Sequence, residues 1–184
     1  MNISKSPVFK TIISMMINPS SVLKSAVSGV PWFFSLIVSA VAFGLFFLQT
    51  GLDLYKTGQK GLGFVILSAG TGAIYGASVI PLLGMIIWCI LKLAKSAKTL
   101  SWAISSFCLS YSGALIYGIS GILFSIVLGW KTSVAFGVTG VLWAIGPMII
   151  TIREMTEGKN KMSIPIASVV SGIVLVSWSF FGQI

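Results

Sequence analysis

Histidine is absent from this chain of 184 residues, and acidic residues number only three. The lack of histidine excludes a zinc-peptidase helix of the HExxH type, because both of its metal ligands are histidines. Cysteine is almost as scarce. Cys89 and Cys108 both lie in apolar segments, where we expect them to pack as small core residues and not to form a disulfide or a metal site. We therefore expect no metal and no other cofactor.

Charged residues of either sign are also rare. They make up 8% of the chain, against roughly 25% in soluble domains, while hydrophobic residues make up 56%. The mean hydropathy is +1.03. Because so few charges cannot cover a water-soluble surface, the composition predicts an integral membrane protein. The net charge of +9 comes from short basic clusters between apolar runs, which does not indicate a nucleic-acid-binding patch.

Long apolar runs are what the sequence has in abundance. About 20 helical residues cross a hydrocarbon core about 30 Å thick. Five runs are long enough: residues 31–52, 62–91, 100–129, 133–152 and 163–181. The second and third are about 30 residues long, so they should tilt, kink or protrude, and Pro81 and Pro147 mark kinks in the second and fourth. We predict an all-α integral membrane protein, with residues 31–184 forming a bundle of five transmembrane helices.

The predicted spans carry no interior acidic or basic residue. A proton relay, a carboxylate pair for ion coupling or a voltage-sensing arginine row needs charge within the membrane. A serine nucleophile needs a nearby base, yet every lysine lies in a loop or at the boundary of a span. We therefore predict that the protein is not an enzyme.

Residues 1–30 are too interrupted to span a membrane. Asn18 and Pro19 divide them into two short amphipathic helices, the second with Val22 and Leu23 on its apolar face. A cleaved signal peptide is a poor fit, because its apolar core would have to include Lys10 or the Asn-Pro pair. We predict that both helices lie in the membrane interface, with Val22 and Leu23 contacting lipid or a partner.

Basic residues are distributed unequally between the two sides of the predicted bundle. Nine fall on the side of the N-terminus: Lys5, Lys10, Lys24, Lys92, Lys95, Lys98, Arg153, Lys159 and Lys161. Three fall on the other: Lys56, Lys60 and Lys131. Since short loops rich in lysine and arginine stay in the cytoplasm, the N-terminus should be cytoplasmic and the C-terminus on the opposite side.

Two sets of side chains are candidate contact sites. Lys92, Lys95 and Lys98 are spaced by three and could gather on one side of a helical extension. They either set the topology alone or also bind anionic lipid or an acidic partner surface. The second set is three tyrosines within the second and third spans, which either bond to neighbouring helices or form a polar lining for a lipid headgroup or solute: Tyr75, Tyr111 and Tyr117.

Small residues recur at helical spacing in the second and third spans. They predict close helix packing in a setting where lipid offers no hydrophobic contrast. The residues concerned are Ala69, Gly72, Ala73, Gly76, Ala77, Gly118 and Gly121. Their faces serve either the internal contacts of the bundle or the docking of a second copy or another membrane protein.

The layout resembles that of the Yip family (Ypt-interacting proteins), and of its bacterial members in particular. The stretch "INPSSVLKSAVSGVPWFF" is similar to their Asn-Pro-led segment before the first span. "IIWCILKLAKSAKTLSWAISSFCLSYSGALI" is similar to their basic loop followed by a tyrosine in the next helix. "VLWAIGPMIITIREMTEGKNKMSIPIASVV" is similar to their fourth span, its basic exit and the start of the fifth. The likeness covers nearly the whole chain.

The resemblance implies a plasma-membrane protein of bacterial type with no catalytic residues to transfer. We expect a non-enzymatic protein that acts in membrane organisation or trafficking, or as an adaptor for other membrane proteins. Its partners would be membrane lipids and either a second copy or a different membrane protein, and not nucleic acid. The alternative is a transporter, channel or lipid-handling component without ion-coupling carboxylates, which predicts a cavity lined by the three tyrosines near Pro81.

Overall fold

The computed structural model describes residues 8–93, 95–158 and 161–182, which are helical almost throughout, with no β-strand among them. Five segments of this part of the chain are long and apolar enough to span a membrane. They are α3 (Trp32–Lys56), α4 (Leu62–Leu93), the pair α5 (Leu100–Ser110) and α6 (Ser112–Leu128), the series η3 (Ser133–Val138), α7 (Thr139–Trp143) and α8 (Ile145–Met155), and α9 (Ser163–Phe181). The predicted all-α class and the five long apolar segments are thereby confirmed. The first helix continues about one turn beyond the predicted end at Leu52, to Lys56.

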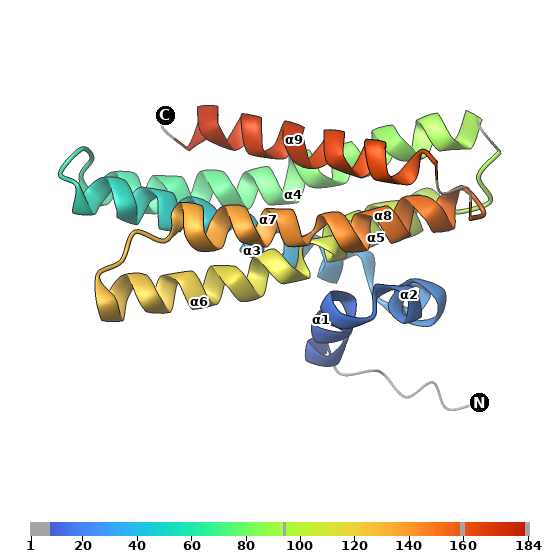
Figure 1. Ribbon diagram of the computed structural model, residues 1–184, viewed down its shortest axis with the longest axis horizontal. Helices are drawn as coiled ribbons and strands as arrows, with labels where there is room; N and C mark the ends of the chain where they lie inside the picture. The colour runs from blue at the N-terminus through green and yellow to red at the C-terminus, as the bar shows by residue number, and fades with distance from the viewer. Residues whose placement is uncertain (1–7, 94, 159–160, 183–184) are drawn as a thin grey trace.

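The five segments lie side by side along the long axis of the molecule (Figure 1). Helix α3 is the central element and packs on α4, α5 and α6, whereas α9 lies mainly on α8. Phe43, Phe46 and Phe47 of α3 are at most 2% exposed and form the middle of the core. Because α3 touches most of the other segments, it positions the side chains discussed below.

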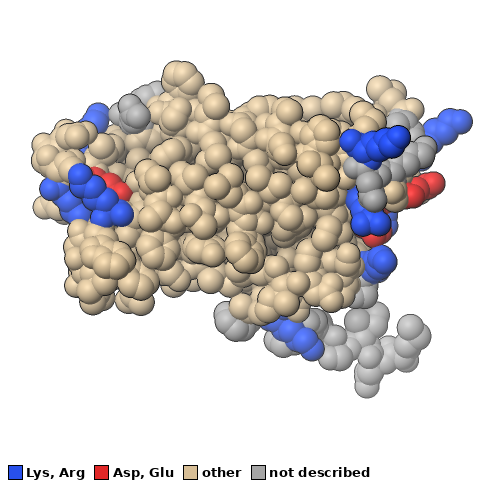
Figure 2. Space-filling view, viewed as in Figure 1, with Lys and Arg blue, Asp and Glu red and all other residues tan. Residues whose placement is uncertain are grey.

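The surface between the two ends of the bundle is apolar. Figure 2 shows charged side chains gathered at both ends of the long axis and basic ones on the lower edge, with a broad uncharged area over the rest of this face. Ile66 of α4 is 71% exposed, Ile126 of α6 is 72% exposed and Val169 of α9 is 61% exposed. A surface with this much exposed aliphatic area matches lipid as its surroundings better than water.

The third segment is interrupted at Tyr111, between α5 and α6. On either side of it, Ser110 Oγ donates to the Ser106 carbonyl (2.8 Å) and Ser112 Oγ donates to the Leu109 carbonyl (2.7 Å). Hydroxyls that bond back to the helix in this way bend it. Tyr111 has φ −85° and ψ 13°, outside the α-helical range, and its side chain is fully buried. The irregular turn therefore lies inside the protein, as a membrane-spanning segment requires.

The fourth segment is interrupted at Ala144, one turn before Pro147. Proline has no N–H to offer the carbonyl of Trp143, and its ring crowds that carbonyl, so the helix breaks just upstream. The structure thus shows an interruption at the level predicted from Pro147. Helix α4, by contrast, continues through Pro81 without one.

The N-terminal segment, residues 8–29, is a helix followed by a run of short helical turns. These are α1 (Val8–Ile17), α2 (Pro19–Ser21), the π-turn η1 (Val22–Ala26) and the 3-10 turn η2 (Val27–Gly29). The side chain of Asn18 accepts a hydrogen bond from the Ser21 N–H (3.3 Å) and starts the second part. The predicted division at Asn18 and Pro19 is therefore present, but the second part is not a regular α-helix.

This segment packs on the flank of the bundle. Helix α1 contacts both α5 and α6, α2 contacts α8, and η2 contacts α5. Ile12 and Met15 are buried, and Val22 and Leu23 are only 3% and 2% exposed. The prediction that Val22 and Leu23 face lipid or a partner is therefore wrong, because their apolar stripe is buried against the protein itself.

Small residues mark the closest approaches between helices. A Cβ added at Gly72 or Gly76 of α4 would collide with α3, at the Phe43 and Ser39 carbonyl oxygens respectively. On α6, Gly118 lies against Leu45 (2.9 Å from an added Cβ), and an added Cβ at Gly121 would meet the Gln49 side chain. Ala69 and Ala73 are partly buried, and both approach Gly44. Ala77 is exposed, so the structure places it outside these helix contacts.

Candidate functional site

The centre of the bundle is an aromatic cluster built on α3. The Phe43 ring lies 5.1 Å from the Tyr75 ring and 4.9 Å from the Tyr111 ring, measured between centroids. The hydroxyl of Tyr75 is hydrogen-bonded to Ser177 Oγ of α9, whereas the buried Tyr111 hydroxyl has no hydrogen-bond partner. Phe43 therefore packs against two of the three tyrosines that were predicted to line a cavity.

The third tyrosine lies elsewhere. Tyr117 is partly buried, and its ring packs against that of Trp143, 5.9 Å away between centroids. The three tyrosines thus take part in two separate aromatic contacts. The predicted role of the three tyrosines as a polar lining near Pro81 stays a prediction.

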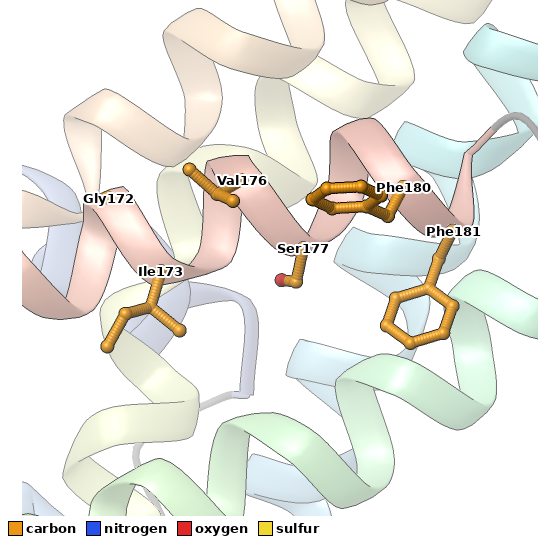
Figure 3. A pocket seen from close by; sticks show the side chains of 6 residues that line it. All are labelled: Gly172, Ile173, Val176, Ser177, Phe180 and Phe181. Carbon is orange, nitrogen blue, oxygen red and sulfur yellow. The ribbon is translucent and has the colours of Figure 1, made fainter.

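A groove runs along α9 beside Tyr75, with a volume of about 550 Å³. Its lining is apolar except for one hydroxyl: Gly172, Ile173, Val176, Ser177, Phe180 and Phe181. Figure 3 shows Ile173, Ser177 and Phe181 pointing to the same side of the helix, and Tyr75 of α4 contacts the last two. The groove therefore lies beside the contact between α9 and α4, which the side chains of Tyr75, Ser177 and Phe181 make here.

The one hydroxyl of the groove is already engaged. Ser177 Oγ donates to the Val174 carbonyl (3.0 Å) and also bonds to the Tyr75 hydroxyl. Nothing lies within 4 Å of a Cβ built on Gly172, so the backbone is open to the groove there. Volumes of 300–1,000 Å³ are typical of ligand sites. The chemistry of this groove suits an uncharged hydrocarbon.

A polar clamp joins the end of α3 to the turn between α6 and η3. The Asp53 carboxylate accepts from the Thr132 N–H (3.1 Å), the Ser133 N–H (2.8 Å) and the Ser133 hydroxyl (2.6 Å). A carboxylate at the N-terminal end of a helical segment satisfies free N–H groups and complements the helix dipole. Asp53 therefore caps the start of the fourth segment.

Lys56 completes this clamp from the next turn of α3. Its Nζ donates to the Ser125 carbonyl and hydroxyl, both at 2.6 Å, and to the Trp130 carbonyl at 3.0 Å. A cation is favoured at a helix C-terminus, where carbonyl groups lack intrahelical partners. We name Asp53, Lys56 and the backbone they bind the α3 clamp. Sequence reasoning ended the span at Leu52 and missed the clamp, because the partners lie about 70 to 80 positions away.

Two further polar residues of α3 bind neighbouring helices. Gln49 Nε2 donates to the Gly118 carbonyl of α6 (3.2 Å), while its Oε1 is buried without a partner. Thr50 Oγ1 accepts from Trp178 Nε1 of α9 (3.0 Å), and the Trp178 ring stacks on Phe46 at 4.8 Å. The polar face of α3 thus fixes α6 and α9 in place.

The three lysines at and after the end of α4 do not lie on one helical extension. Helix α4 ends at Leu93, and Lys95 has φ 68°, in the left-handed region. Lys92 Nζ donates to the Ser96 carbonyl (3.1 Å). Lys98 Nζ lies 4.7 Å from the centre of the Trp102 ring and 3.9 Å from a Glu154 carboxylate oxygen.

Lys95 is exposed, whereas Lys98 is partly buried. The loop therefore presents Lys92 and Lys95 outward, and Lys98 is held against the protein. Cys89, just before this loop, is an exposed free thiol, and Cys108 is a buried one.

The fold and these sites define an all-helical bundle with five apolar segments of membrane-spanning length. No protein-family model, curated protein or solved structure matches the chain. Membership of the Yip family accordingly stays a prediction from the sequence stretches that resemble it.

Proposed function

We propose that the protein is a non-enzymatic membrane protein of Yip type that organises the bilayer around it, with its N-terminus in the cytoplasm. The observation that carries the proposal is the placement of the N-terminal segment on one flank of the bundle. Helix α1 contacts α6 as well as α5, and α6 starts after the 11 residues of α5. At 1.5 Å per residue, this is about 16 Å from the start of the third segment.

The flank that carries the segment differs from the rest of the surface. Lys10 and Lys24 are exposed on it, and Figure 2 shows a basic patch on the lower edge, where Figure 1 places α1. Near the same end of the bundle, Ile90 and Leu93 of α4 are 52% and 90% exposed. An amphipathic segment that occupies one leaflet on one side expands that leaflet and favours curvature.

Reconstitution into liposomes containing anionic lipid tests this proposal. We expect the protein to reduce the mean vesicle diameter measured by electron cryomicroscopy, and Lys10→Glu with Lys24→Glu to abolish most of the reduction. The matched control is Lys60→Glu with Lys131→Glu, which changes the net charge equally at the opposite end and should leave the reduction intact. Equal diameters with and without wild-type protein would overturn the proposal.

The cytoplasmic placement of the N-terminus is supported by the nine-to-three distribution of basic residues between the ends. Lys5 and Lys159 lie outside the described residues. In a Cys89→Ser, Cys108→Ala background, a membrane-impermeant maleimide applied to intact cells should label Lys60→Cys and leave Lys24→Cys unlabelled until the membrane is opened. The reverse pattern would contradict this orientation.

A lipid-handling role is the second candidate, and the groove on α9 is the observation that favours it. We propose that the groove holds one acyl chain of a bilayer phospholipid, because its only hydroxyl, that of Ser177, is already engaged and its walls are aliphatic and aromatic. It also lies on the exposed face of α9, where Val176 is 59% exposed and Phe180 67% exposed. The tyrosines, which would line the central cavity of a channel or transporter, make aromatic contacts with Phe43 and Trp143 instead.

A phospholipid with a photoactivatable acyl chain tests this role. We expect it to label the peptide containing α9, and Gly172→Leu to lower that labelling several-fold by filling the groove. Gly146→Leu on α8 is the matched control, since a Cβ at either glycine meets open space. Labelling of α9 that is unchanged by Gly172→Leu would contradict the acyl-chain site and favour a second copy of the chain on this face if α9 then cross-links between protomers.

A further inference from the structure

The interruptions of the third and fourth segments lie side by side. Gly113, two residues beyond Tyr111, faces Trp143, the residue before Ala144: a Cβ built on Gly113 would lie 2.6 Å from Trp143 Cδ1. Both segments therefore lose regular α-helical hydrogen bonding at the same level of the bundle. Helices bend most readily at such points, where the backbone ladder is already broken.

An unsatisfied polar group weakens the same level further. The Tyr111 hydroxyl is fully buried and has no hydrogen-bond partner. A buried donor without a partner destabilises the packed arrangement relative to one in which it is solvated or paired. The packed form of the third segment is thus held against this penalty by other contacts.

The N-terminal segment supplies contacts that cross the interruption. Helix α1 touches α5 on one side of Tyr111 and α6 on the other, while α2 touches α8, the half of the fourth segment beyond Ala144. Its buried side chains join the same apolar core as Tyr111 and Ala144: Ile12, Met15, Val22, Leu23 and Val27. A helix that packs on both halves of a broken helix limits the angle between them.

The outer face of the segment has the opposite chemistry. Lys10 and Lys24 are exposed, and residues 8–30 contain no acidic residue. An anionic leaflet attracts such a face within about 8–10 Å of the surface, the Debye length near physiological salt. Packing and headgroup attraction therefore pull the segment in different directions.

We infer that the N-terminal segment is a brace that fixes the angle between the two halves of the third segment and of the fourth, and that an anionic phospholipid surface releases it and lets both bend further at Tyr111 and Ala144. The inference rests on the proposed placement of this segment in the cytoplasmic leaflet. The brace adds a lipid-regulated change in the shape of the bundle, whereas the proposed effect on membrane curvature does not require the bundle to change shape.

Two pairs of spin labels on the full chain test the brace, in a Cys89→Ser, Cys108→Ala background and in nanodiscs. The brace pair is Ile17→Cys with Leu123→Cys, which links the segment to α6 at exposed positions. The hinge pair is Ser101→Cys with Ile126→Cys, which spans the interruption at exposed positions of α5 and α6. Distances between the labels are compared in zwitterionic lipid and in lipid with phosphatidylglycerol.

We expect both distances to change together when anionic lipid is added. Lys10→Gln with Lys24→Gln should suppress both changes, and the control Lys60→Gln with Lys131→Gln should retain them. Ile12→Ala, which weakens the packing of the brace, should produce both changes already in zwitterionic lipid. Ile12→Val is the milder variant if the alanine form does not fold.

The brace is overturned if the distance in the hinge pair changes while that in the brace pair does not, or if the distance in the hinge pair never changes. Its failure is distinct from that of the proposed function, because vesicle diameter reports curvature whether or not the hinge moves. If the two label distances changed together while the vesicle diameters stayed unchanged, the brace would be supported and the proposed effect on membrane curvature rejected.

Discussion

The two ends of the bundle both carry basic residues but use them differently. At the end where α3 finishes, Lys56 makes three hydrogen bonds to the turn after α6, and Asp53 caps the next segment. Lys95 at the other end and Lys10 and Lys24 on the adjoining flank are exposed instead. Among the described residues the ion pair is Lys98 with Glu154, at 3.9 Å.

The difference concerns which end can move. Directional hydrogen bonds from α3 fix the positions of α6 and η3 relative to it, because each bond requires a set distance and angle. The N-terminal segment is held at the opposite end by apolar contacts, which are non-directional. The α3 clamp is therefore the rigid end, and the flank with the N-terminal segment is the adjustable one.

The largest effect is expected at the adjustable end. Val22→Asp combined with Leu23→Asp removes two buried side chains, each contributing about 1.5–3 kcal/mol, and places two charges in the core. We expect the N-terminal segment to detach while the five long segments stay folded. Trypsin should then cut at Lys10 and Lys24 much faster, and Ile17→Asp, at a 79% exposed position, is the control. Loss of insertion of α3 would instead show that the boundary at Pro31 is wrong.

A substitution in the α3 clamp, at the rigid end, should lower the stability of the whole bundle. Asp53→Ala removes the acceptor of three hydrogen bonds, so we expect the free energy of unfolding to fall by about 2–3 kcal/mol. Helix content during titration with SDS measures this. Glu157→Ala, at an exposed residue of the opposite end, should have little effect. If the two variants unfolded alike, the two ends would not differ in the way described.

The smallest expected effect is a difference in the free energy of unfolding between two variants, each of which replaces a lysine at one end of the bundle. Lys56→Met removes the donor to Ser125 and Trp130, and we expect a loss of about 1 kcal/mol. Lys92→Met leaves one hydrogen-bond acceptor, the Ser96 carbonyl, without its donor and removes a distant contact with the Trp88 ring, so its effect should be smaller. The same titration compares them. A larger loss for the Lys92 variant would remove the distinction between the clamp and the opposite end.

Much of the fold could be predicted from the sequence because apolar length is a strong signal. The five runs match the observed segments closely, and the second and fifth start at the predicted residues Leu62 and Ser163. The break near Pro147 follows from the missing N–H of proline. The interruption at Tyr111 was not predicted, although Ser110 and Ser112 on either side are a local signal for it.

The sites were less predictable because they depend on contacts distant in the chain. An amphipathic stripe indicates that Val22 and Leu23 are buried, but not whether lipid or protein covers them. Small residues predict close packing, yet Gly76 meets α3 and its neighbour Ala77 faces outward. The roles of Asp53 and Lys56 require knowing that the end of α6 lies beside them.

The α3 clamp can form only late in the biosynthesis of the protein, because its partners are far apart in the chain. Asp53 lies 79 residues before Thr132, so the ribosome needs roughly 4–16 s to reach its partner at 5–20 residues per second. During that interval Asp53 and Lys56 lack the partners that they bind in the folded protein. The contact between the end of α3 and the start of the fourth segment is therefore one that the bundle can acquire only after the first three segments have been synthesised.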